Sequence, residues 1–455
     1  MTGTTASTRI AAWAASVPQR ASDDALVHLV ARAFLDTYAV RLAANGHPLR
    51  DVLERYAPGG EGPATDWSSG RRHTAEAAAM VNASMAHVLD YDDVTSPLRG
   101  HPTVVLLPAL VAVAEEEGAD GRQLAASYAV GFEVICKLAK AFAVEHYAAG
   151  WHSTATMGAI GAAAGASHLA ALTAAETTHA VGVAAARAAG TKASFGTMTK
   201  SFQVGAAAAE AVRSMRLAQA GLTAAEQALE GSVGGFAPLY GGAGHVEALA
   251  TELAGLGAGS GELASSGLDV KKYPCCYATH RALDIILDLR SEHRLPPADV
   301  ERVVVRTNEG GIAPLVHHRP QTGLEAKFSM EFAVATALHD GLPRLATFRD
   351  ENVRRTELQE FLPKVTATDD AGPQWPRLTE VCVELAGGHT VQRSATQLRG
   401  SAESPLTDGE LLTKVDDCLR YGRSATAAER VGELVFGWGD RRVGELLGDL
   451  VEATR

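Results

Sequence analysis

The stretch STATMGAIGAAAGASHLAAL, residues 153–172, decides the fold class, because it has the length of a long helix and contains no Asp, Glu, Lys, Arg or Pro. Gly158, Gly161 and Gly165 fall on one face of such a helix, where neighbouring helices can approach closely. Its apolar character comes from alanine and glycine, which contribute little to transfer into hydrocarbon, and His168 lies inside it. We therefore predict a central helix of a packed protein core and not a membrane span.

The chain from Asp23 to about Pro238 has the same character. Alanine-rich segments are broken by Gly, Pro or Asn, with almost no alternation of β-branched residues, which predicts a nearly all-helical region. The expected helices are residues 24–45, 74–89, 103–118, 121–145, 153–172 and 199–220. Thr173, Thr199 and Thr223 are the expected N-caps.

The composition changes after a glycine-rich stretch, Gly255 to Gly267, which indicates a crossover to a second domain. Apolar residues then alternate in Val300–Thr307 and Glu380–Leu385, which predicts strands with one solvated face. Helical patterns lie between and beside them at residues 282–293, 329–339 and 352–362. The second region is therefore predicted to be a smaller α+β domain, and the helical tail, residues 407–454, is expected to pack back on the first domain.

Length and charge exclude several classes of protein. With 455 residues, 46% of them hydrophobic and 21% charged, the chain can bury large cores, and two domains are expected. The formal net charge of −12, without a basic stripe, argues against a nucleic-acid surface. A small anionic substrate remains possible if cations gather locally, because nearby groups set the field of a pocket.

The cysteines and the N-terminus bear on location and cofactors. Five cysteines without a C-x-x-C pair predict neither a disulfide framework nor a zinc ribbon, and adjacent Cys275 and Cys276 are poor ligands for one iron–sulfur cluster. A reducing cytoplasm fits this usage. The first 22 residues carry Arg9 and Arg20 without an acid, as a weak transit peptide would, but have no long apolar core of a secretory signal. We predict a cytoplasmic protein.

Two polar clusters are the candidates for chemistry. The run KKYPCCYATHR, Lys271–Arg281, places cations, a histidine and two thiols together, which suggests a pocket for a small anion. A second cluster, Asp90-Tyr91-Asp92-Asp93, is followed by a loop to His101. A Lys-Lys pair is usually solvated and a Cys-Cys pair is usually buried packing, so the first cluster alone is weak evidence for an anion pocket. The second, independent cluster strengthens that prediction.

Several motifs together resemble the MmgE/PrpD family, whose members include 2-methylcitrate dehydratase, cis-aconitate decarboxylase and an iminodisuccinate epimerase. The matching motifs, in collinear order between about residues 23 and 418, are residues 80–93, 101–102, 131–134, 150–152, 195–200, 272–276 and 325–329. The resemblance implies a mainly α fold. A large all-helical domain would come from residues 1–266 and 401–455, and a smaller α+β lid domain from residues 267–400. It also implies a homodimer and an active site between the domains, without a metal or an organic cofactor.

The resemblance also assigns site residues. The catalytic set falls on Asp90, His101, His152, Lys200 and Lys271. Substrate contacts are expected at Gln203, Tyr273, His280 and Arg281.

Two positions depart from the family pattern. Val94 stands where the decarboxylase branch carries a threonine associated with its site. Gln203 stands where many members have a histidine. Both departures count against decarboxylation of cis-aconitate.

These residue types suit reactions that form a carbanion beside a carboxylate. Imidazole is the side chain whose ordinary pKa suits proton removal near neutral pH, so His101 and His152 are the acid–base candidates. Lys200 and Lys271 would stabilise the enediolate, and Asp90 would orient one imidazole. For Asp92 and Asp93 we expect helix-end capping or a salt bridge near the dimer contact.

The leading interpretation is a lyase of the 2-methylcitrate dehydratase kind, acting on a small di- or tricarboxylate. The same residues could serve an epimerase or a decarboxylase. A relative that only binds a carboxylate, without catalysis, is the alternative from another class of protein.

Overall fold

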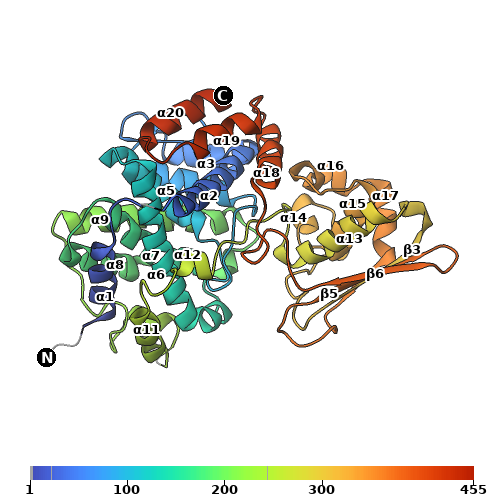
Figure 1. Cartoon of the computed structure of the whole chain (residues 1–455), viewed down its shortest axis with the longest axis horizontal. Coiled ribbons are helices and arrows are strands. Elements are labelled where there is room, and N and C mark those ends of the chain that lie inside the picture. Colours follow the sequence, from blue (N-terminus) through green and yellow to red (C-terminus); the bar gives the residue numbers. More distant parts are fainter. Residues whose placement is uncertain (1–3, 22, 243) are drawn as a thin grey trace. The chain divides into compact units, whose positions relative to one another are not determined.

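The computed structural model describes residues 4–21, 23–242 and 244–455, and they fold into two compact units. The first unit comprises Met1–Asp269 and Asp408–Arg455, and the second comprises Val270–Thr407. The first is built almost wholly from helices and the second combines helices with a sheet (Figure 1). The predicted fold class, mainly α with a smaller α+β part, is confirmed.

The first unit contains the following elements. Its helices are α1 (Ala6–Ser16), α2 (Asp24–Ala43), α3 (Leu49–Tyr56), α4 (Ala75–His87), α5 (Thr103–Glu117), α6 (Gly121–Ala148), α7 (Ser153–Leu169), α8 (Ala174–Arg187), α9 (Met198–Gln219), α10 (Phe236–Tyr240), α11 (His245–Ala254), α12 (Glu262–Ser265), α18 (Asp408–Tyr421), α19 (Ala428–Phe436) and α20 (Val443–Thr454). Two short antiparallel strands, β1 (Ala64–Thr65) and β2 (Arg72–His73), and the 3₁₀ turns η1 (Ala44–Gly46) and η2 (Lys192–Ser194) complete it.

Helix α7 is the centre of this unit, as predicted. Every one of its residues is buried, and it packs against α5, α6, α8 and α9. A Cβ on Gly161 would lie 2.6 Å from the carbonyl oxygen of Gly131, and one on Gly165 would lie 2.8 Å from that of Ser127. The glycine face therefore lets α6 and α7 cross at a distance that a larger side chain would prevent. In the described part of the chain, no helix is long and apolar enough to cross a membrane.

The predicted caps were right only in part. Thr173 caps α8 through a bond from the amide of Glu176. Thr197, not Thr199, caps α9, because its hydroxyl accepts from the amide of Thr199. Thr223 caps no helix, because residues 224–235 of the described chain form turns and irregular structure, and the next helix starts at Phe236.

The second unit has a four-stranded sheet in the order β4-β3-β5-β6, with β3 and β4 parallel and the other neighbours antiparallel. Its strands are β3 (Val300–Thr307), β4 (Val365–Thr368), β5 (Thr379–Leu385) and β6 (Thr390–Ala395). Its helices are α13 (His280–Glu292), α14 (Gly323–Ala326), α15 (Met330–His339), α16 (Asp350–Val353) and α17 (Thr356–Phe361), with the 3₁₀ turns η3 (Tyr277–Thr279), η4 (Pro297–Asp299), η5 (Leu345–Phe348) and η6 (Leu362–Lys364).

Strands β3 and β5 lie at the predicted positions, whereas the sequence patterns did not reveal β4 and β6. The single helix expected over residues 352–362 is wrong. Arg355 has an extended backbone, with ψ 130°, so the segment is divided into α16 and α17. The Arg355 guanidinium forms an ion pair with Asp340 at 2.9 Å, and this pair stabilises the non-helical backbone between α16 and α17.

The C-terminal helices pack on the first part of the chain, as predicted. Helices α18 and α19 contact α2, and α20 contacts α5. Lys414 of α18 is fully buried, with its Nζ 2.6 Å from Asp36 Oδ1 of α2 and 2.8 Å from the carbonyl oxygen of Tyr91. The end of the chain thereby holds the loop that follows α4.

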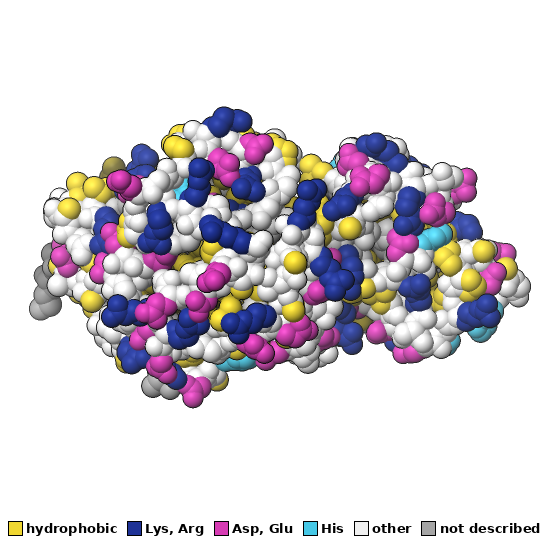
Figure 2. Space-filling view, turned by 90° about the horizontal axis from the view of Figure 1, so that it is seen from above, with side chains coloured by type: hydrophobic (Ala, Val, Ile, Leu, Met, Phe, Trp, Pro, Cys, Tyr) yellow, Lys and Arg dark blue, Asp and Glu magenta, His cyan; other side chains and the backbone are white. Residues whose placement is uncertain are grey.

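None of the five cysteines, all of which the structure describes, forms a disulfide bond. On the face shown in Figure 2, cationic and anionic side chains are interspersed.

Candidate active site

The site in the first unit is organised by the loop between α4 and α5. Helix α4 ends at His87, and Asp90 then takes a left-handed backbone conformation with φ 55°. Aspartate tolerates this conformation better than most residues, because its short side chain can bond locally. The turn leaves Asp90 half-buried and directs Asp92 and Asp93 into the core, where both are 1% exposed or less.

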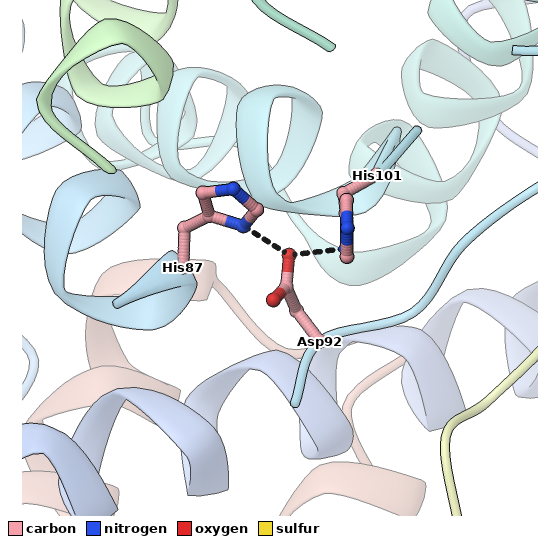
Figure 3. Close-up of side chains that lie close together, drawn as sticks. All are labelled: His87, Asp92 and His101. Carbon is pink, nitrogen blue, oxygen red and sulfur yellow. Dashed lines mark hydrogen bonds and ion pairs between the residues drawn. The ribbon is translucent and has the colours of Figure 1, made fainter. Parts of the chain in front are cut away.

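One carboxylate lies between two histidine rings (Figure 3). Asp92 Oδ2 is 2.8 Å from Nδ1 of His87 and 3.0 Å from Nδ1 of His101. Burial by itself would raise the pKa of Asp92, but the facing His101 and His87 hold it well below its usual range. Burial lowers the pKa of His87 to about 4, although the charge of Asp92 by itself would raise it. This ring is therefore neutral near pH 7.

Asp90 pairs mainly with a lysine. Its Oδ1 is 2.6 Å from Nζ of Lys200 and 3.7 Å from Nε2 of His101. Lys200 lies in the first turn of α9, with its ammonium 5.3 Å from the centre of the Phe195 ring. Asp90 thus holds a lysine beside the open side of His101, while Asp92 holds the other side of the ring.

His152 has an uncharged partner. It precedes the first residue of α7, and its Nδ1 is 2.8 Å from Oε1 of Gln203. The amide nitrogen of Gln203 donates to the carbonyl oxygen of Thr191 at 3.1 Å, which turns Oε1 toward the ring. His152 Nδ1 therefore carries the hydrogen and Nε2 carries the lone pair. Burial, followed by the nearby His87 and Lys200, lowers the pKa of His152 to about 2.

A second buried charge cluster lies behind this loop. Asp93 accepts a short hydrogen bond from Thr103, whose hydroxyl is also 2.7 Å from that of Tyr128. Burial raises the pKa of Asp93 well above its usual range, and Asp36 and Asp92 add to the effect. The expectation of helix-end capping or a salt bridge is therefore wrong for Asp93: its short bond is to a hydroxyl in the core. Asp92 is not a cap either, but it does form ion pairs, with His87 and His101. Its expected place near a dimer contact stays a prediction.

We expect Asp93→Asn to stabilise the protein at neutral pH. The raised pKa means that stability from this group is present below about pH 3.8 and is lost as the pH rises toward the pKa of the folded state. The amide oxygen of asparagine can still accept the bond from Thr103, and the amide does not titrate. The free energy of unfolding at pH 7.5 should rise, because the variant no longer carries a buried carboxylate whose charged form is unfavourable.

Denaturant unfolding at pH 7.5 and at pH 4.5 checks the Asp93 prediction. The gain should shrink at the lower pH, because pH 4.5 lies much closer to the range below about pH 3.8, where both states hold the proton and the carboxyl costs no stability. Equal stability of the two proteins at pH 7.5 would show that the carboxylate is not costly in the core.

The remaining predicted residues belong to the second unit. Lys271 is 2% exposed, and Tyr273 is fully buried with its hydroxyl donating to Asp284 at 2.7 Å. His280 is also buried, with Nε2 3.3 Å from the carbonyl oxygen of Cys275, and the half-buried Arg281 donates to the carbonyl of Thr396 at 3.0 Å. Burial raises the pKa of the Cys275 thiol to about 12, which is unsuited to a nucleophile.

The first unit thus brings together Asp90, His101, His152, Lys200 and Gln203, and it adds residues that sequence reasoning missed. His87 lies in the last turn of a predicted helix, three residues before Asp90, and that spacing was the available signal. Asp92 was considered only as a structural residue. Lys414 comes from the far end of the chain, and its sequence context carries no signal for a place beside this loop.

His87, Asp92 and His101 also form the one group of described residues whose possible metal-ligand atoms lie within 4.8 Å of one another. Ligands of a tetrahedral zinc ion are about 3.3 Å apart, given zinc bond lengths of 2.0–2.1 Å. The nitrogen–oxygen contacts at 2.8 and 3.0 Å are both shorter, the first being a hydrogen bond and the second an ion pair. The geometry therefore fits a charged hydrogen-bonded group better than a metal centre.

Comparison with known proteins gives matches over most of the chain. The MmgE/PrpD N-terminal domain matches residues 8–247 and the MmgE/PrpD C-terminal domain matches residues 273–439. A cis-aconitate decarboxylase of Mus musculus is 28% identical over 353 residues, 74% of this chain and 70% of that protein. The cis-aconitate decarboxylase of Aspergillus terreus is 26% identical over 383 residues, 79% of this chain and 78% of that protein.

Proposed function

Because the chain belongs to the MmgE/PrpD family, we propose that it is a cofactor-independent lyase for a small di- or tricarboxylate that removes a proton beside a carboxylate. Elimination of water is the first candidate reaction. The observation that supports it is the contrast between two nearby imidazoles: His152 meets a neutral amide, whereas His101 lies between two carboxylates. Paired groups with opposite environments are typical of a base and an acid in one site.

The environments suggest which histidine has which role. His152 is neutral, with its lone pair on Nε2, so it is our candidate for the base that takes the proton. An anionic substrate would raise its pKa toward the working range on binding. His101, facing Asp92 and Asp90, is the candidate acid that protonates the leaving hydroxyl. The Lys200 ammonium would stabilise the negative charge of the enediolate.

Decarboxylation is the second candidate, because the relatives named above are cis-aconitate decarboxylases. Val94 and Gln203 still favour elimination. Incubation in deuterium oxide with a panel of polycarboxylates, followed by NMR, separates the reactions. A hydro-lyase gives exchange at the acidic C–H and an unsaturated product with all carboxylates retained, whereas a decarboxylase releases carbon dioxide. Exchange without net product would indicate an epimerase, and no exchange or product across the panel would contradict the proposed function.

We expect activity to survive exhaustive treatment with EDTA and to need no added cofactor. The proposed steps use only imidazole, ammonium and carboxylate groups of the chain. Turnover of the same enzyme is compared before and after chelation and after adding back divalent metals. Loss of turnover that one metal restores would contradict this prediction.

Lys200→Ala should lower turnover by roughly 10²-fold or more, the scale for removing one oriented charge donor in a site. Thermal unfolding is measured alongside turnover, because the lysine side chain is only 18% exposed and its loss leaves Asp90 without the ion pair at 2.6 Å. Lys271→Ala is expected to have a similar effect on turnover. Lys140→Ala is the matched control, since Lys140 pairs with Glu262, away from these histidines, and should keep near wild-type turnover. Near wild-type kinetics in Lys200→Ala would remove this lysine from the mechanism.

Three further features are proposed from the family resemblance. The second unit acts as a lid on the site, the enzyme works as a homodimer, and it resides in the cytoplasm. Tyr273, His280 and Arg281 would then contribute to substrate binding from the lid.

A further inference from the structure

A single oxygen atom meets two imidazole nitrogens in the site. Asp92 Oδ2 lies 2.8 Å from His87 Nδ1 and 3.0 Å from His101 Nδ1, and the two rings meet edge to face with centres 4.6 Å apart. A carboxylate oxygen only accepts hydrogen bonds, and a nitrogen lone pair would be repelled at this distance. His87 Nδ1 therefore donates a hydrogen bond to Asp92, whereas His101 Nδ1 meets the same oxygen as an ion pair outside hydrogen-bond geometry. The carboxylate charge 3.0 Å away still favours a hydrogen over a lone pair on His101 Nδ1, which leaves Nε2 as the second atom of each ring that can gain or lose a proton.

We infer that Asp92 is a positioning residue: its Oδ2 holds His87 and His101 as Nδ1–H imidazoles and makes His101 Nε2 the atom that transfers the proton. Asp92 would act through His101 without touching substrate. The choice of Nε2 as the reacting atom rests on the proposed function, whereas the tautomers are inferred from the contacts of Asp92 without substrate.

Asp92 is better placed than Asp90 for this role. Asp90 Oδ1 is 3.7 Å from His101 Nε2 and only 2.6 Å from Lys200 Nζ, so the lysine is its principal partner. Asp92 is fully buried, and its other oxygen, Oδ1, has no hydrogen-bond partner among the residues that the structure describes. Since His87 remains neutral, the negative charge of Asp92 is available to a positive charge on His101.

The proton balance of the elimination agrees with this arrangement. His152 takes the hydrogen beside the carboxylate as a proton, and the electron pair of that C–H bond becomes the new double bond. The C–O bond breaks with its electron pair on oxygen. The Nε2–H bond of imidazolium His101 breaks in turn, and its proton makes the leaving group water. His101 returns to the neutral Nδ1–H form, which Asp92 still holds.

The tautomers can be measured without substrate, on full-length protein labelled with ¹⁵N-histidine. In NMR spectra of the ring nitrogens near pH 8, His87 and His101 should each show a protonated Nδ1 and an unprotonated Nε2. The signals are assigned by their loss in His101→Asn and His87→Phe. An Nε2–H tautomer for wild-type His101 would overturn the inference whatever reaction the enzyme performs.

Variants separate positioning from a merely structural role. Asp92→Leu removes the acceptor, so His101 should show a mixture of tautomers and turnover should fall by roughly 10²- to 10⁴-fold. Asp92→Asn can keep a neutral acceptor oxygen and is the variant to use if Asp92→Leu does not fold. It should retain the Nδ1–H form while losing turnover.

Two control variants probe the other contacts of the rings. His87→Phe should leave the His101 tautomer unchanged, because the carboxylate remains. Gln203→Leu should alter the signals of His152 and not those of His101, since Gln203 bonds only the former ring. An unchanged His101 tautomer in folded Asp92→Leu would overturn the inference. If the tautomers behave as expected but no polycarboxylate reacts, the proposed function fails and the tautomer assignment stands.

Discussion

His101→Asn should lower product formation by roughly 10²- to 10⁴-fold, the usual contribution of a positioned acid or base, yet retain exchange of the substrate C–H in deuterium oxide. The variant loses the proton for the leaving hydroxyl but keeps the base. His152→Asn should lose both product and exchange, because it lacks the group that takes the proton. Parallel measurements of product by absorbance and of deuterium by NMR check both expectations.

Controls make the His101 and His152 comparison specific. His146→Asn is a matched control, since His146 is a buried histidine that contacts Thr156 and the carbonyl oxygen of Tyr240 outside this group. Thermal unfolding of all three variants separates loss of chemistry from loss of fold. If His101→Asn loses exchange and His152→Asn keeps it, the roles of base and acid are reversed. Unchanged kinetics in both would transfer the acid–base chemistry to Asp90 and the lysines.

Lys414→Met should lower the free energy of unfolding by about 3–5 kcal/mol, the cost of leaving one member of a buried ion pair unpaired. Lys414 is 2% exposed in its side chain and Asp36 is 1% exposed, with 2.6 Å between their charged atoms. Burial raises the pKa of Asp36 even with the lysine present, so without it the carboxyl should become protonated. Denaturant unfolding at pH 7.5 provides the measurement.

A double-mutant cycle tests the origin of the Lys414 effect. Adding Asp36→Asn to Lys414→Met should recover much of the lost stability, because no buried charge is then left without its partner. Arg420→Met is the surface control: this residue pairs with Asp416 on the exposed side of α18 and should change stability by less than about 0.5 kcal/mol. A loss of similar size in Arg420→Met would show that the helix, and not the buried pair, is responsible.

Periodicity and composition were sufficient for the elements with many local signals. The glycine face of residues 153–172 predicted that a neighbouring helix approaches closely, and the structure identifies that neighbour as α6. The alternation at Val300–Thr307 predicted β3 with the same bounds. Short strands such as β4, of four residues, give too few positions for a pattern and form because a neighbouring strand provides their hydrogen bonds.

By itself, the sequence determined the helical fold class, the break before the α+β unit and, through motif resemblance, the candidate acid–base residues. Only the tertiary structure decided which carboxylate meets which histidine. Asp90, Asp92 and Asp93 are neighbours in sequence, but the left-handed turn at Asp90 directs them to a lysine, a pair of imidazoles and a buried hydroxyl. Lys414 reaches the same loop across more than 300 residues of chain. Such contacts depend on how α4, α5, α9 and α18 pack against one another. The packing fixes how deeply each group is buried and how far it lies from other charges, and these two factors determine its protonation state.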